Sequence, residues 1–181
     1  MGAALRTTFI VAFLAVSGGF SDVQAQKHQP PREQTIFYEG KPFKYPVPLS
    51  PAVLNVLVKT VENQREMGIE DNSRVRSNPA KLFRATEVHL DGLNEIDLVI
   101  IGLPPMRGVD TGWFWLVRST PNNPKILLWA TGNSIQVMDS KTNGYCDISS
   151  AWASASETLD KVYHFDGKEY MLWKEKRMPI R

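Results

Sequence analysis

The sequence is poor in the residues that most often carry covalent or metal chemistry. Cys146 is its one cysteine in 181 residues, so no disulfide can form within the chain and the core must supply the stability. A catalytic thiolate needs a base beside it, and the neighbouring sequence offers none. We therefore interpret Cys146 as a small buried residue.

Histidines are equally scarce, with three in the chain. His89 and His164 fall on different predicted strands and lack the spacing of a zinc site. The sequence also lacks a nucleophile elbow around serine and glycine-rich phosphate loops. The segment Asp91–Asp97 is laid out like a calcium loop, yet His89 and Leu93 stand where calcium requires oxygen ligands. We predict a turn at this segment, no metal site and no cofactor.

The sequence also lacks a large excess of positive or negative charge, and it lacks a long apolar run. There are 21 Lys and Arg against 19 Asp and Glu, a balance that argues against a nucleic-acid partner. The apolar run 9–16 is far shorter than the roughly 20 residues that span a bilayer. It follows Arg6 and precedes Val23-Gln24-Ala25, which carries the small residues of a cleavage site.

These N-terminal features predict a signal peptide, residues 1–25, that is cleaved after Ala25. We therefore expect a periplasmic or secreted protein with no membrane span after cleavage. An uncleaved N-terminal membrane anchor is the alternative.

The remaining chain is long enough for one domain with a core of its own. Residues 26–49 are rich in proline and polar side chains, which predicts a flexible lead-in arm with at most a short edge strand at Thr35–Tyr38. Residues 50–175 form the predicted domain. Residues 176–181 are interpreted as a solvated basic tail.

A helix is predicted to open the domain. Ser50 is a favourable N-cap, and Pro51 at the first helical position costs no hydrogen bond. Gly68 is the predicted C-terminal stop. Apolar residues recur at helical spacing and form one stripe, Val53, Leu54, Leu57, Val58 and Val61.

Beyond Pro79 the pattern changes to short apolar runs separated by turn residues, which predicts antiparallel strands. The predicted strands are 84–90, 96–102, 113–118, 126–130, 135–138, 145–153, 161–165 and 168–173. One helix followed by these strands predicts an α+β fold, in which one amphipathic helix packs on a mainly antiparallel sheet of about six to seven short strands. A β-sandwich with a helical appendage is the alternative.

Two glycine-containing turns are expected to set the strand register. Asn143-Gly144 accepts positive φ at both central positions of a type I′ turn, so it predicts a tight hairpin. Asp166-Gly167 gives the same signal between the last two strands. A type I′ turn there would place Tyr163 opposite Tyr170.

Aromatic side chains, by contrast, are plentiful, with five tryptophans. Trp113 and Trp115 alternate along one predicted strand and so share a face. Trp129 and Tyr145 lie on other predicted strands. If exposed, these four rings would form a platform for a sugar or a peptide, whereas buried rings would only fill the core. We take the four as candidate binding residues.

Three motifs resemble those of a group of exported, uncharacterised bacterial proteins. The first is an aromatic strand of pattern FW-[LIV]-x-R, here Phe114 to Arg118. The others are a TNGY-x-DI hairpin, here Thr142 to Ile148, and a closing Y-x-F-D-G-x-x-Y hairpin, here Tyr163 to Tyr170. The resemblance covers residues 82–173. It implies export and the architecture above, and it brings no activity, cofactor or catalytic residue.

These features together favour an exported, non-enzymatic protein that binds a protein, peptide or glycan of the cell envelope. A structural or accessory subunit of an envelope complex is the first alternative. The second is a hydrolase of an envelope polymer that uses paired carboxylates, for instance Asp97 with Asp147. The lack of any recognisable catalytic spacing argues against the hydrolase.

Overall fold

The computed structural model describes residues 34–63, 77–92, 95–104, 111–120 and 123–180, with the side chains of residues 61–63 left out. The fold described below is that of the unit Arg32–Arg181. The predicted signal peptide, the first residues of the lead-in arm, the side chain of Val61 and the stop at Gly68 lie outside the described residues.

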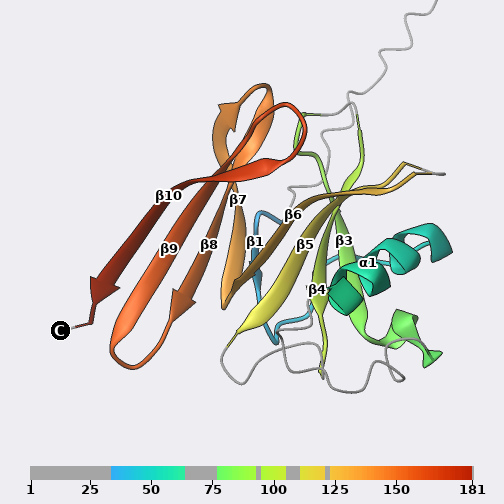
Figure 1. Cartoon of the computed structure of the whole chain (residues 1–181), viewed down its shortest axis with the longest axis horizontal. Helices are drawn as coiled ribbons and strands as arrows, with labels where there is room; N and C mark the ends of the chain where they lie inside the picture. The colour runs from blue at the N-terminus through green and yellow to red at the C-terminus, as the bar shows by residue number, and fades with distance from the viewer. Residues whose placement is uncertain (1–33, 64–76, 93–94, 105–110, 121–122, 181) are drawn as a thin grey trace, which may run out of the picture. The chain divides into compact units, whose positions relative to one another are not determined.

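The described strands form two antiparallel sheets of five strands each (Figure 1). Sheet A has the order β1 (Ile36–Tyr38), β7 (Ser134–Thr142), β8 (Tyr145–Ala153), β9 (Glu157–Phe165) and β10 (Tyr170–Pro179). Sheet B has the order β2 (Pro46–Val47), β3 (Phe83–Val88), β4 (Asp97–Gly102), β5 (Gly112–Arg118) and β6 (Lys125–Gly132). The remaining elements are the helix α1 (Pro51–Asn63) and the short 3₁₀ helix η2 (Pro79–Lys81).

Sheet B is covered on both faces, and every residue of β4 is buried. On one face, Val53 and Leu57 of α1 pack in one cluster with Trp115, and Figure 1 shows α1 beside this sheet. On the other face, Phe114 packs in a second cluster with Ile148 of sheet A. Burial on two faces explains why β4 and β5 are continuous apolar runs rather than alternating ones. The result is a sandwich-like fold with one helix.

The expected α+β content, with one helix and antiparallel strands, is confirmed, but the single sheet of six to seven strands is wrong. The difference arises at Gly132-Asn133, where β6 of sheet B ends and β7 of sheet A begins. The sequence pattern there indicated an ordinary turn. A strand that passes from one sheet to another makes the corner of a sandwich, and apolar periodicity carries no information about which sheet a strand joins.

Some strand limits also differ from the prediction. β10 extends to Pro179, because Lys176–Pro179 pair with Glu157–Asp160 of β9. Most of the expected basic tail is therefore part of sheet A. β1 confirms the edge strand predicted near Thr35–Tyr38, and its Phe37 is fully buried between the sheets.

Ser50 caps α1 as predicted. The backbone N–H of Val53 donates to Ser50 Oγ at 3.3 Å, and Leu54 N–H donates to the Ser50 carbonyl at 3.0 Å. Val53 and Leu57 are buried, as the apolar stripe predicted. Across the described residues, no helix is both long and apolar enough to cross a membrane.

The hairpin at Asn143-Gly144 is confirmed. Thr142 pairs with Tyr145, and the two residues between them have φ of 52° and 84°, as a type I′ turn requires. Asn143 Nδ2 also donates to the carbonyl of Phe165 at 2.7 Å, which ties the turn to β9.

Replacing Gly144 by valine should lower the free energy of unfolding by more than about 1 kcal/mol, because a β-branched residue resists positive φ. A Cβ at Gly144 would meet no atom within 4 Å, so the cost is conformational rather than steric. Urea denaturation measures it. Gly144→Asn is the control, since asparagine tolerates positive φ, and equal stability of the two variants would contradict the assignment.

The turn at Asp166-Gly167 differs from the prediction. Phe165, not Tyr163, lies opposite Tyr170, so the turn is centred one residue later, on Gly167-Lys168. Asp166 Oδ1 accepts hydrogen bonds from the backbone N–H groups of Lys168 (2.7 Å) and Glu169 (2.8 Å). Aspartate favours this position at the start of a turn. Its side chain has therefore overridden the Asp-Gly preference for the central positions.

Candidate functional site

A network of polar side chains, from the fully buried Asp97 to the exposed Glu95, lies where β4 and β5 meet β8. Asp97 is fully buried and lies directly opposite Arg118 in the strand register. Arg118 Nε lies 3.4 Å from Asp97 Oδ1 and 2.7 Å from Glu95 Oε2, and Nη2 donates to the Tyr145 hydroxyl at 2.5 Å. One guanidinium thus joins sheet B to sheet A through three partners.

Burial raises the pKa of Asp97 to about 6, although the charge of Arg118 and its hydrogen bond lower it. The nearby carboxylates Asp91 and Glu95 raise it further. Among the described residues, Asp97 Oδ2 and Asp91 Oδ1 are buried without a hydrogen-bond partner. The ionised form of Asp97 is therefore less stable in the folded protein than in water.

The stability of the protein should fall as the pH rises from about 4 to about 6. Asp97 has an unfolded-state pKa near 3.8 and a folded-state pKa of about 6, so the folded state holds the extra proton in this range and loses that advantage as it ionises. The loss should be about 2 kcal/mol. Denaturation of the wild type and of Asp97→Asn at several pH values measures it, and parallel pH profiles would contradict it.

A second buried carboxylate, Asp147, has a histidine as its own partner. Asp147 Oδ2 lies 3.8 Å from His164 Nε2, and the His164 ring stacks on Trp173 with centroids 4.3 Å apart. The Tyr170 hydroxyl donates to the Cys146 carbonyl at 2.8 Å. Burial, followed by the charge of Asp97, raises the pKa of Tyr170, so this hydroxyl stays neutral. Of the suggested pair, Asp97 thus contacts Arg118 and Asp147 contacts His164, and the charge of each carboxylate raises the pKa of Tyr170.

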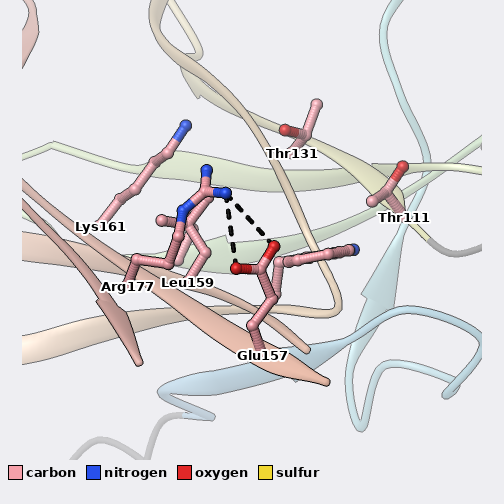
Figure 2. A pocket seen from close by; sticks show the side chains of 8 residues that line it. Thr111, Thr131, Glu157, Leu159, Lys161 and Arg177 are labelled. Carbon is pink, nitrogen blue, oxygen red and sulfur yellow. Dashed lines mark hydrogen bonds and ion pairs between the residues drawn. The ribbon is translucent and has the colours of Figure 1, made fainter. Parts of the chain in front are cut away.

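An open groove lies between sheet A and the ends of β5 and β6, with a volume of about 300 Å³ (Figure 2). Ser150 and Trp152 of β8 lie opposite Lys161 and Leu159 of β9, so their side chains share one face of sheet A. The residues that line the groove are Thr111, Thr131, Ser150, Trp152, Glu157, Leu159, Lys161 and Arg177. Figure 2 shows the two threonines across the groove from the charged side chains.

Ion pairs hold the charged side chains of the groove. Arg177 Nη1 lies 3.3 Å from Glu157 Oε1 and 3.5 Å from Oε2, and these contacts are the dashed lines in Figure 2. Lys161 Nζ lies 3.6 Å from Glu175 Oε2 of β10. Ser154 fixes the turn before β9, because its Oγ accepts from the backbone N–H of Glu157 at 3.1 Å. The position of Glu157 is thus set by the chain as well as by Arg177.

None of the four predicted binding residues lines this groove. Trp113 is 4% exposed and Trp115 is fully buried, both in the cluster under α1. Trp129 packs against the same cluster and Tyr145 against the cluster between the sheets. The platform expected from these rings is wrong for Trp113 and Trp115, because both faces of sheet B are covered.

Sequence reasoning overlooked Trp152, the one tryptophan in the groove lining. Its signal was the pattern Ser150-x-Trp152, which continues the inward face of Ile148. Lys161 and Leu159, at the matching positions of β9, show the same change from buried apolar to mixed side chains. Where the core-facing side chains of two neighbouring strands change from apolar to mixed, the opposite sheet no longer covers them.

No family model, no curated protein and no solved structure matches this chain. Across the part of the chain that the structure describes, no three His, Cys, Asp or Glu side chains are grouped to hold a metal ion. The groove combines hydroxyls, charged pairs and an indole in an open recess, which gives it the means to bind a ligand.

Proposed function

We propose that the protein is exported and serves, without catalysis, as a binding protein of the cell envelope. Its ligand, a segment of an envelope polymer, occupies the groove between sheet A and the ends of β5 and β6. The observation that carries this proposal is the half-buried Trp152 beside hydroxyls and ion pairs in one recess. Such a recess offers apolar contact and several directed polar contacts together.

The absence of catalysis is part of this proposal. Glu157 is the one carboxylate among the residues that line the groove, and it is paired with Arg177. Hydrolysis of a glycan by acid and base needs two carboxyl groups that face each other across the scissile bond. The groove lining does not supply them, so a binding role fits it better than a hydrolase.

Two measurements test the proposal. N-terminal sequencing of the protein recovered from the periplasm or the medium should give a chain that begins at Gln26. The purified protein should co-sediment with insoluble cell-wall material, and Trp152→Ala should weaken this at least about tenfold. Retention of Met1 in the cytoplasm, or sedimentation unchanged by the substitution, would contradict the proposal.

The exposed end of sheet A favours a second candidate function, an accessory subunit of an envelope complex. β10 is the last strand in the order of sheet A, and Met171, Leu172 and Trp173 are 53%, 51% and 61% exposed. Exposed apolar residues together on one strand often mark a protein interface. If this function holds, Trp173→Ser should remove a stoichiometric partner from envelope pull-downs while Trp152→Ala leaves it. The opposite result would support the groove.

A further inference from the structure

We infer that the groove binds a neutral saccharide, such as two linked uncharged sugar rings. The inference rests on the proposed function, because it names the ligand class of the same site. It follows from the charge balance of the groove, from Trp152 and from the arrangement of the strands beneath.

The groove contains charged groups but carries little net charge. Arg177 is paired with Glu157 and Lys161 with Glu175, so each cation has a carboxylate within 4 Å. An anionic ligand would have to displace a carboxylate, and a cationic ligand would have to displace an arginine or a lysine. Both pairs are partly exposed, with side-chain exposures of 60% and 31% for Arg177 and Glu157 and of 28% and 43% for Lys161 and Glu175, so exchanging one partner for a charged ligand gains little. A neutral ligand leaves both pairs intact.

The polar groups of the groove suit hydroxyls. The ion pair of Arg177 and Glu157 offers donors and acceptors side by side, which neighbouring hydroxyls of a sugar ring can meet at once. Thr111 and Thr131 place two more hydroxyls across the groove (Figure 2). The indole of Trp152 gives a flat apolar surface for the C–H face of the same ring.

The strands beneath the groove argue against an extended peptide. Leu159 and Lys161 pair with β8 on one side and with β10 on the other. Their backbone groups are therefore used within sheet A, and a peptide could not add to the sheet there as a further strand. Contacts with these two strands must rely on side chains, as they do for a saccharide. The volume of about 300 Å³ is at the small end of ligand pockets and limits the occupant to a short segment.

Isothermal titration calorimetry on the mature chain that begins at Gln26 tests the inference. The neutral probes are cellobiose, maltose and N,N′-diacetylchitobiose, and the competing probes are digalacturonate and trialanine. At least one neutral disaccharide should bind with a Kd of about 1 mM or tighter, and more tightly than either competing probe. Trp152→Ala should weaken this binding at least about tenfold, whereas Tyr38→Ala, which removes an exposed aromatic side chain outside the groove lining, should leave it unchanged.

A charge variant tests the same point without removing the indole. Glu157→Gln keeps the size of the side chain but leaves Arg177 without its carboxylate. Glu157→Gln should weaken the binding of the neutral disaccharide about fivefold and strengthen the binding of digalacturonate by a similar factor. Glu87→Gln, an exposed position on β3, is the control.

The outcomes separate the inference from the function beneath it. If digalacturonate or trialanine binds the wild type more tightly than the neutral probes, the inferred ligand class is wrong, although the groove still binds a ligand. If no neutral probe binds while cell-wall co-sedimentation depends on Trp152, the inference fails and the proposed function stands. If co-sedimentation is also independent of Trp152, both fail.

Discussion

Replacing Arg118 by methionine should lower the free energy of unfolding by about 3 kcal/mol at pH 7. Methionine keeps the unbranched stem but removes the group that contacts Asp97, Glu95 and Tyr145. Asp97, which is fully buried, then loses the guanidinium beside it. Breaking one side of a buried pair costs more than the pair itself contributes, because the remaining charge stays desolvated.

The cost of Arg118→Met should depend on pH. Burial already raises the pKa of Asp97 to about 6, and loss of Arg118 removes the main influence that lowers it. Near pH 4 the carboxyl is protonated in the folded state of both proteins. The variant should then lose only about 1 kcal/mol, from the contacts with Glu95 and Tyr145.

Chemical denaturation at pH 4 and pH 7 measures both values. Arg84→Met is the matched control, because Arg84 is exposed on β3 and the same substitution there should change stability by less than about 0.5 kcal/mol. Asp97→Asn in the Arg118→Met background should recover part of the loss at pH 7. A loss of equal size at both pH values would show that packing, rather than the charge of Asp97, explains the effect.

Two local sequence signals predicted local structure correctly. Ser50-Pro51 predicted the start of α1, and Asn143-Gly144 predicted its hairpin, because in each case the preference acts within a few residues. The turn predicted at Asp166-Gly167 was placed wrongly because two local preferences of aspartate compete there. The side chain that accepts two backbone N–H groups placed Asp166 at the start of the turn rather than at its centre.

What the sequence could not give is the relation between distant strands. Trp115 and Trp152 both lie on strands with alternating aromatic or apolar residues, yet one is fully buried and the other faces the groove. The difference depends on which layer lies opposite each strand, and that is set by the corner at Gly132-Asn133. The four rings taken as candidate binding residues therefore do not line the proposed groove, whereas Trp152, which was not among them, does.

The corner itself should tolerate almost no added volume, so Gly132→Ala should lower the free energy of unfolding by about 2–3 kcal/mol. A Cβ at Gly132 would lie 2.6 Å from the carbonyl oxygen of Ala151 and 3.2 Å from that of Ser134. Both contacts are backbone atoms. The Ala151 carbonyl also accepts the N–H of Asn133 at 2.7 Å, so it cannot move away without breaking the hydrogen bond that joins the corner to β8.

Gly144→Ala separates this steric cost from the ordinary cost of replacing glycine. A Cβ at Gly144 meets no atom within 4 Å, and its cost of about 1 kcal/mol comes from a φ of 84° alone. Urea denaturation should rank Gly132→Ala as clearly the less stable variant. Equal losses would mean that β6 and β7 do not approach β8 closely at the corner.

Because Thr131 and Ser150 flank this contact and line the groove, Gly132→Ala should also weaken the co-sedimentation with cell-wall material under conditions in which the variant is still folded.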